Sequence, residues 1–483
     1  MIPDRLEFDR LIKIILITSR CYCTQIAVTR SVSESVVSLS RKSNESILAA
    51  HFQQLYNLIL PNKVELTRMR CARMIGKSLN LSKYYREPLY RNSITIMLNS
   101  AFTNVFGLVF WIVGARLLST GEIGLAAAAI AAGSLIISLS RLGLDIGLLR
   151  FVPQSAEKSA LYDTVTSIVV SVAFVLTAAF LLMLPFLSPA LAFLRQGTFL
   201  LAFLAYACLY ATVIVQGNTM IAMRKGDLYL LQGLVLGLRI PLLLLLVSLT
   251  TLGIFISFDV TLIVTLLISA FWLYRLGLVS RFRISRRLLK EIAPFSFGNY
   301  TAGILGMLPQ TVVPILIVNT VGADATAYFF VAYSLAAALS LVSSSVGMSL
   351  LVEGSHDLPI KENVGKSLRL TFAILIPLLL IMLLFGDKLL LLFGKQYSEQ
   401  AFLMLQLLAL SSIFLAVIDL GITVKRIQKD VRSVNLVYSS MAILIIAFGY
   451  LALLRYGLIG LGYVWLASAA FVSIYMGWTL TRI

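Results

Sequence analysis

Residues 123–149 read IGLAAAAIAAGSLIISLSRLGLDIGLL, an apolar run in which Arg141 and Asp145 are the only charged residues. An α-helix rises 1.5 Å per residue, so about 20 apolar residues cross a hydrocarbon core of about 30 Å. A helix also satisfies its own backbone hydrogen bonds where no water is available. The stretch therefore predicts a membrane-spanning helix.

Similar stretches recur along the chain. Hydrophobic residues make up 59% of it, charged residues only 13%, and the mean hydropathy is +0.92. No soluble domain of this length has such a composition. We predict an all-α polytopic membrane protein with about twelve transmembrane helices, at residues 94–115, 123–149, 163–185, 189–215, 228–249, 253–274, 294–319, 326–352, 367–386, 401–423, 432–453 and 456–478.

Basic residues are distributed unevenly over the connecting loops. The loops after the even-numbered spans and the C-terminus carry 19 Lys and Arg residues, whereas the opposite loops carry Arg116, Arg195, Lys388, Lys395 and Arg455. By the positive-inside rule both termini are cytoplasmic, in a cell membrane. The net charge of +18 then reflects topology, and no nucleic-acid partner is predicted.

The N-terminal residues 1–93 are polar and contain no spanning segment. They fit a disordered cytoplasmic arm, an organelle-targeting segment or an artefact of an upstream start codon, with Met69 and Met74 as alternative starts. We favour the arm or the artefact. The membrane region then divides into an N-lobe at 94–276 and a C-lobe at 277–483.

Residues for catalysis or metal binding are sparse. The chain has four cysteines and two histidines, without the spacing of a metal site. The predicted external loops are at most ~14 residues long, which leaves no room for a catalytic domain. The sequence therefore predicts a protein without a cofactor that is not an enzyme.

The two lobes show signs of duplication. An acidic residue opens a helix rich in small residues at Glu122 and again at Asp324, 202 positions later. Because each unit would hold six spans, both enter the membrane from the same side, which makes them parallel repeats about an axis along the membrane normal. We predict two six-helix lobes around a central cavity.

Span 7 carries a polar and small-residue stripe at helical spacing, formed by Asn299, Gly303, Gly306 and Gln310. Span 1 has a shorter counterpart, formed by Ser100, Asn104 and Gly107. Such stripes arise from close helix packing or from the lining of a hydrophilic cavity. In the second interpretation Asn299 and Gln310 contact substrate, and the three prolines of span 7 bend it as a moving part.

Five short motifs carry a family resemblance by their order and spacing: GARLLSTGEIG at 114–124, LGLDIGLLRFVP at 142–153, PFSFGNY at 294–300, EGSHD at 353–357 and LLFGKQY at 391–397. Over about residues 85–480 the chain resembles the oligosaccharide flippases of the polysaccharide transporter group (Wzx-like), in the MOP superfamily. The resemblance implies alternating-access flipping of a polyprenyl- or dolichyl-linked oligosaccharide for cell-surface glycan synthesis. The expected partners are that lipid and the bilayer, with a monomer that can associate with glycan assembly proteins.

A phosphate that crosses the membrane requires fixed positive charge, which arginine supplies by bidentate contact. Candidate substrate-binding residues are Arg239 in span 5, and Arg141 and Arg150 near the cytoplasmic end of span 2. The resemblance favours Arg141. Alternatively, Arg239 reaches an interface, and the other two anchor the topology, with Arg141 and Asp145 as an intrahelical i, i+4 pair.

Within the predicted spans we identify two acidic residues, Asp145 and Asp419. A buried carboxylate is costly unless neutralised, so either could bind a coupling Na⁺ or H⁺. Alternatively, Asp419 lies near the cytoplasmic interface and pairs with a neighbouring helix. The membrane potential could also act on an anionic headgroup.

Other functions remain in competition. A multidrug cation antiporter of the same superfamily should have carboxylates in its central cavity, yet spans 1 and 7 contain none. A glycan polymerase or glycosyltransferase would need catalytic groups in a sizeable loop. An unspecific scramblase would tolerate substitution of Arg141 and Arg239.

Overall fold

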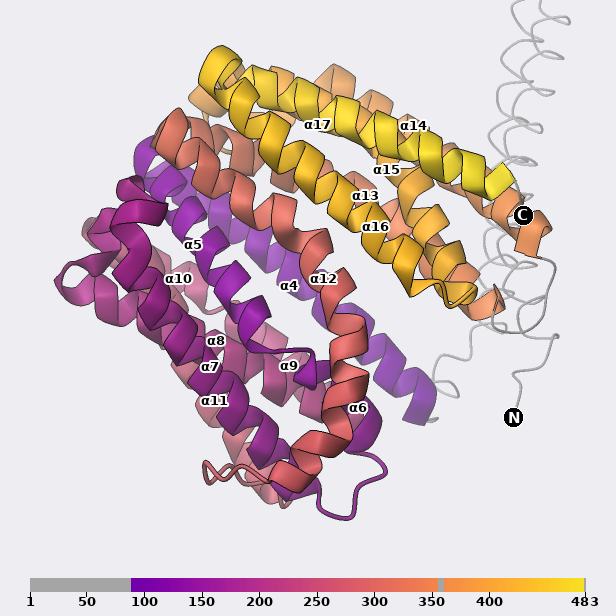
Figure 1. Cartoon of the computed structure of the whole chain (residues 1–483). Helices are drawn as coiled ribbons and strands as arrows, with labels where there is room; N and C mark the ends of the chain where they lie inside the picture. The colour runs from indigo at the N-terminus through magenta and orange to yellow at the C-terminus, as the bar shows by residue number, and fades with distance from the viewer. Residues whose placement is uncertain (1–87, 355–359, 482–483) are drawn as a thin grey trace, which may run out of the picture. The chain divides into compact units, whose positions relative to one another are not determined.

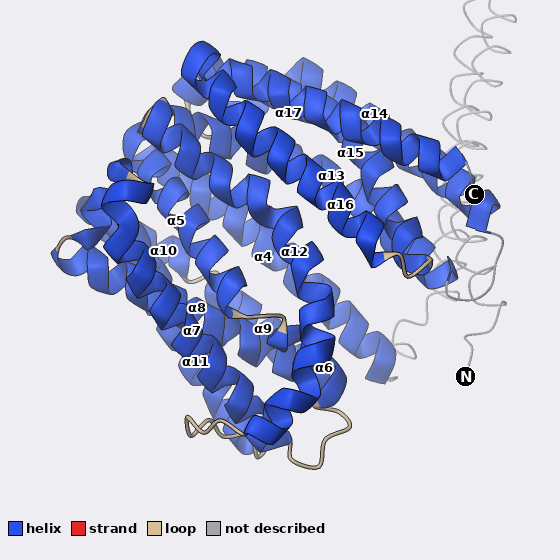
Figure 2. Cartoon of the chain, in the orientation of Figure 1, coloured by secondary structure: helices blue, strands red, loops and turns tan. Residues whose placement is uncertain are grey.

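The computed structural model describes residues 88–354 and 360–481, apart from the side chains at 88–90, 297–299, 352–354, 360–362 and 481 (Figure 1). Of the predicted N-terminal arm, residues 1–93, the first 87 lie outside the described residues, and residues 88–93 form the start of the first described helix. Every regular element in the described part is a helix (Figure 2). The long helices are α4 (Pro88–Leu117), α5 (Thr120–Ser140), α7 (Lys158–Leu187), α8 (Gly197–Ala222), α11 (Thr250–Arg275), α12 (Arg286–Thr320), α13 (Ala323–Gly354), α14 (Ile360–Leu390), α15 (Lys395–Ile427) and α17 (Gly449–Thr481).

Some spans are built from several pieces. The fifth consists of α9 (Gly226–Leu236) and α10 (Arg239–Leu246), and the eleventh begins with α16 (Val431–Ile443). Within the described residues ten helical runs are long and apolar enough to cross a membrane, and two of these, Gly226–Arg275 and Val431–Leu480, are 50 residues long and hold two spans each. The prediction of twelve transmembrane helices is confirmed.

The predicted second span at 123–149 is wrong at its C-terminal end. Helix α5 ends at Ser140, and residues 144–151 form a separate short helix, α6 (Leu144–Phe151). The intervening turn has left-handed backbone angles at Leu142 (φ 49°) and Gly143 (φ 71°). A Cβ atom on Gly143 would lie 2.5 Å from the carbonyl oxygen of Ser296 in α12, so the close approach of α12 requires glycine there.

The predicted fourth span at 189–215 is also displaced. Residues Pro189–Arg195 form a 3₁₀ helix, and α8 extends from Gly197 to Ala222. Gln196 is extended and Gly197 is left-handed (φ 44°), which separates the two helices. The apolar pattern continues across the break, and for this reason hydropathy alone placed the span too early.

Each half packs around its own helices. In the first half α8 packs against α7 and α11, and in the second α15 packs against α13, α14 and α17. Helix α5 joins the halves because it packs against both α12 and α13. A capping box formed by Ser119 and Glu122 starts α5 at this junction.

The duplicated turns lie side by side. The hydroxyl of Thr120 donates a hydrogen bond to the Asp324 carboxylate. A Cβ atom on Gly124 would lie 1.8 Å from the carbonyl oxygen of Ala323, so the backbones of α5 and α13 touch where each helix begins. The positions identified as repeats thus form the contact between the halves, as expected for two related six-helix units.

Candidate functional site

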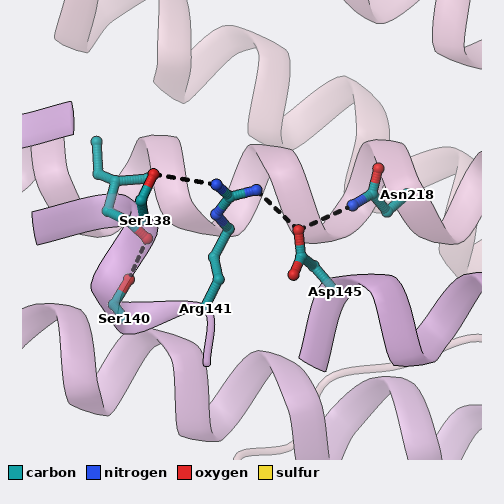
Figure 3. Close-up of polar contacts among 6 residues, drawn as sticks. Ser138, Ser140, Arg141, Asp145 and Asn218 are labelled. Atoms are coloured by element: carbon teal, nitrogen blue, oxygen red, sulfur yellow. Dashed lines mark hydrogen bonds and ion pairs between the residues drawn. The ribbon is translucent and has the colours of Figure 1, made fainter. Parts of the chain in front are cut away.

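Arg141 is held at the turn between α5 and α6 (Figure 3). Its Nη1 donates to Oδ2 of Asp145 at 2.8 Å, and its Nη2 donates to Oγ of Ser138 at 3.1 Å. Asn218 of α8 donates to the same Asp145 oxygen at 3.2 Å. The ion pair at positions i and i+4 therefore forms across a turn and not within one helix.

The turn is fixed by its contact with α12. Gly147 leaves room for Ser296, whose Oγ would lie 2.7 Å from an added Cβ atom. The hydroxyl of Tyr300 donates to the carbonyl oxygen of Leu139 at 2.7 Å. These contacts place Arg141 beside α12, the helix expected to move.

Arg141 differs from Asp145 in its access to solvent. The side chain of Asp145 is 4% exposed, whereas that of Arg141 is 27% exposed. The Nε of Arg141 is buried without a hydrogen-bond partner. The exposed part of the guanidinium keeps further N–H donors for an anion, because the bonds to Asp145 and Ser138 use only one N–H each of Nη1 and Nη2, while Oδ2 of Asp145 already accepts from a cation and an amide.

Arg150 lies at the end of α6, stacked on an aromatic ring of α12. Its guanidinium carbon is 4.4 Å from the ring centroid of Phe295. This cation–π contact orients the side chain without neutralising its charge.

Arg239 lies in the first half, in a setting of aromatic rings. Its guanidinium carbon is 5.3 Å from the ring centroid of Phe110 and 5.0 Å from that of Phe258. Nη2 faces Gly107, at 3.4 Å from the position of an added Cβ atom, and Nε is buried without a partner. The short stripe of span 1 therefore ends at Arg239.

Gln310 and Asp419 line a cavity of about 230 Å³ within the second half. Tyr333 donates a hydrogen bond to Oε1 of Gln310 at 3.3 Å, and Ser343 donates to Oδ2 of Asp419 at 2.5 Å. Other residues of the wall come from α12, α13, α15, α16 and α17 and include Gly306, Ser340, Ser412, Tyr438 and Trp465. The cavity combines one carboxylate with hydroxyls and aromatic faces.

The predicted site residues thus occupy separate places. Arg141, Asp145 and Arg150 lie around α6, Arg239 lies among rings of the first half, and Gln310 and Asp419 share the cavity. The side chain of Asn299 lies outside the described residues. In the part of the chain that the structure describes, no group of three or more His, Cys, Asp or Glu side chains could hold a metal ion.

The count of two acidic residues within the spans is wrong. Asp259 lies in α11, 8% exposed, and its Oδ1 is buried without a hydrogen-bond partner. Asp163 lies in the first turns of α7, 5% exposed. Both stand within or at the edge of predicted apolar spans, so a residue-by-residue search of those spans for charge would have found them.

Comparison with known proteins identifies the fold. Over 80% of its length the chain superposes on 98% of an inward-facing multidrug resistance MATE family transporter of the MOP superfamily (TM-score 0.59, 15% identity). It also superposes on 87% of the lipid II flippase MurJ in an inward closed conformation, with a TM-score of 0.61 and 13% identity. The chain has the MOP transporter fold.

A curated protein is similar to this chain in sequence. A putative O-antigen transporter of Shigella flexneri is 23% identical over 226 residues, 46% of this chain. The chain covers 54% of that relative's length, about half. No family model matches. The resemblance predicted from the sequence is confirmed, and these three similar proteins are named as transporters or flippases.

Proposed function

We propose that this membrane transporter flips a lipid-linked oligosaccharide, with a polyprenyl or dolichyl phosphate carrier, by alternating access. The observation that carries the proposal is Arg141, a partly exposed guanidinium held beside α12, a helix that contains three prolines. Such a group suits the phosphate of a lipid carrier, which must pass a medium of low dielectric constant. The similarity to an O-antigen transporter and the fold shared with a lipid II flippase support this substrate class.

Arg150 and Arg239 have secondary roles in this proposal. Arg150 first attracts the headgroup at the end of α6, and Arg239 provides positive charge deeper in the first half. Gln310 offers an amide to sugar hydroxyls in the second half. The protein functions as a monomer with both termini in the cytoplasm, beside the enzymes of glycan assembly.

Asp419 is the proposed site for the coupling ion, H⁺ or Na⁺. It lines the cavity, and its carboxylate accepts a hydrogen bond from the hydroxyl of Ser343. Asp145 is less suited to this role because its Oδ2 already accepts from Arg141 and Asn218.

Proteoliposomes test the substrate. The full chain is reconstituted, and the leaflet distribution of a polyprenyl-diphosphate oligosaccharide is followed. Hydrogen bonds to charged groups contribute about 1.5–3 kcal/mol, so Arg141→Ala should slow flipping by about tenfold to a hundredfold. Arg141→Lys keeps the charge and the pairing with Asp145 and should recover part of the rate. Arg195→Ala, an exposed arginine at the other end of the helices, is the matched control.

A cation antiporter is the second candidate. Its supporting observation is the carboxylate of Asp419 in a cavity walled by Tyr333, Tyr438 and Trp465, a combination that suits an organic cation. Uptake of a cationic dye in the same proteoliposomes distinguishes the two. Dye uptake without oligosaccharide flipping would reject the flippase proposal.

A further inference from the structure

The linker between the two halves, residues 276–285, is held to α7 by a buried carboxylate. Asp163 accepts hydrogen bonds from the backbone amide of Arg281 at 2.7 Å and from that of Arg283 at 3.2 Å. It also accepts from the hydroxyl of Ser280 at 3.1 Å. One side chain thereby fixes the positions of Ser280, Arg281 and Arg283 in an otherwise irregular segment.

Two hydroxyls of α7 extend this attachment. Ser159 Oγ accepts from the backbone amide of Val279 at 3.1 Å, and Thr164 Oγ1 accepts from that of Ser285 at 3.1 Å. The backbone of residues 279–285 therefore has a defined shape, although it forms no helix.

The exposed side chains of residues 281–284 alternate between basic and apolar. Arg281 and Arg283 are exposed, and so are Phe282 (67%) and Ile284 (53%). Phe282 has a left-handed backbone (φ 55°), an uncommon conformation for a bulky residue. In the described part of the chain no carboxylate pairs with Arg281 or Arg283, and the nearby Glu157 is bound to Arg287.

The depth of the linker matches the headgroup layer of the bilayer. Helix α7 has 30 residues and is about 45 Å long, whereas the hydrocarbon core measures about 30 Å, so one end extends beyond the hydrocarbon. The polar residues Lys158, Ser159 and Asp163 assign this extension to the N-terminal end, which holds the linker. Trp272 and Tyr274 are exposed at the end of α11, directly before the linker. Exposed Trp and Tyr side chains are typical of the membrane–water interface.

We propose that residues 281–284 form a binding site for anionic phospholipid headgroups of the adjacent leaflet. Arg281 and Arg283 contact the phosphate, and Phe282 and Ile284 insert at the boundary with the acyl chains. The proposal depends on the membrane fold and not on the transported substrate. Because the linker joins the halves, bound lipid would fix one end of α12 relative to α7.

Tryptophan quenching in nanodiscs tests the site. The full chain with Phe282→Trp is placed in phosphatidylcholine discs that contain phosphatidylglycerol, with bromine on one lipid or on the other. Quenching in the unsubstituted chain is subtracted, since four native tryptophans contribute. A basic residue near the surface enriches anionic lipid by about fivefold, so brominated phosphatidylglycerol should quench more strongly.

Two charge-matched variants separate a local site from general attraction. Arg281→Ala with Arg283→Ala should remove the preference for phosphatidylglycerol. Arg224→Ala with Lys225→Ala removes the same charge from another turn at the same end of the helices and should retain the preference. Equal quenching by both brominated lipids, or an equal loss in both double variants, would overturn the proposal.

Asp163→Asn provides a test with opposite expected signs. The substitution adds one unit of positive charge, so general attraction predicts a stronger preference for phosphatidylglycerol. A site that depends on the fixed backbone predicts a weaker one, because the amide nitrogen that replaces one carboxylate oxygen cannot accept, so the backbone amide of either Arg281 or Arg283 loses its acceptor. A strengthened preference in this variant would contradict the proposal.

Discussion

The two halves of the membrane region share a helix order but differ in what surrounds the charged side chains within their helices. In the first half Arg141 is paired with Asp145, and Arg239 is covered by two aromatic rings. In the second half Asp419 faces a cavity. A duplicated scaffold therefore constrains the backbone contacts between helices, as at Gly124 and Ala323, while the polar side chains are free to diverge.

The largest expected effect comes from the contact that joins the halves. Gly124→Ala places a methyl group against the backbone carbonyl of Ala323, which no side-chain rotation can relieve. Overpacking typically costs about 1–3 kcal/mol, and we expect the upper end, about 3 kcal/mol. Thermal unfolding in detergent measures this loss of stability. Gly303→Ala is the control, because Gly303 has open space around it. Equal stability of the two variants would show that the helices separate without cost.

Asp145→Asn tests how much the ion pair between Arg141 and Asp145 stabilises the first half. Loss of one partner of a buried ion pair costs about 3–5 kcal/mol, but Arg141 is partly exposed, so about 2 kcal/mol is expected. Asp259→Asn is the comparison, since the buried Oδ1 of Asp259 has no hydrogen-bond partner to lose. We expect no loss of stability there. A larger loss of stability in Asp259→Asn than in Asp145→Asn would contradict the view that the ion pair of Asp145 is the more stabilising contact.

Asp419→Asn tests the second half through activity. The amide keeps the shape and can still accept from Ser343, so the melting temperature should change little. Ion-driven transport should fall by about tenfold if the carboxylate carries the coupling ion. The measurement compares transport with and without an imposed Na⁺ or H⁺ gradient, beside Gln310→Asn in the same cavity. Unchanged stimulation by both gradients would remove Asp419 from the coupling site.

The smallest effect is expected at the start of α16. Hydrogen bonds from the hydroxyl and the backbone amide of Ser433 lower the pKa of Asp430, which caps this helix. Asp430→Ala should cost about 1 kcal/mol, and Asp430→Asn clearly less. A lowered pKa in the folded protein gives stability that is present above the unfolded pKa and is lost as the pH falls through the folded one. The difference between wild type and Asp430→Ala should therefore shrink below about pH 4.

The presence of the transmembrane helices was predictable, because a helix that crosses the membrane depends on the local composition of its own segment. The spans at 253–274 and 401–423 fall within α11 and α15 with only a few residues of difference. The end of α5 was not predictable, because apolar residues continue past Ser140 to Leu149, interrupted only by Arg141 and Asp145 among the charged residues. The turn at Gly143 exists because α12 approaches it, and that contact spans about 150 positions of sequence.

The candidate site was predictable in its residue types but not in its grouping. Arginines and aspartates within apolar runs are conspicuous because burial of charge is costly. Sequence reasoning therefore selected Arg141, Arg239 and Asp419, although it overlooked Asp259. Their distribution over separate places depends on which helix faces meet, and one sequence contains no record of those contacts.

The sequence by itself determined that this protein crosses a membrane, in about twelve helices arranged as two related halves, because the bilayer acts on each apolar segment independently. Only the tertiary structure decided that Arg141 pairs with Asp145 across a turn, that Asp419 faces a cavity and that Asp163 holds the linker. These arrangements depend on contacts between segments far apart in the chain, which packing creates and hydropathy does not encode.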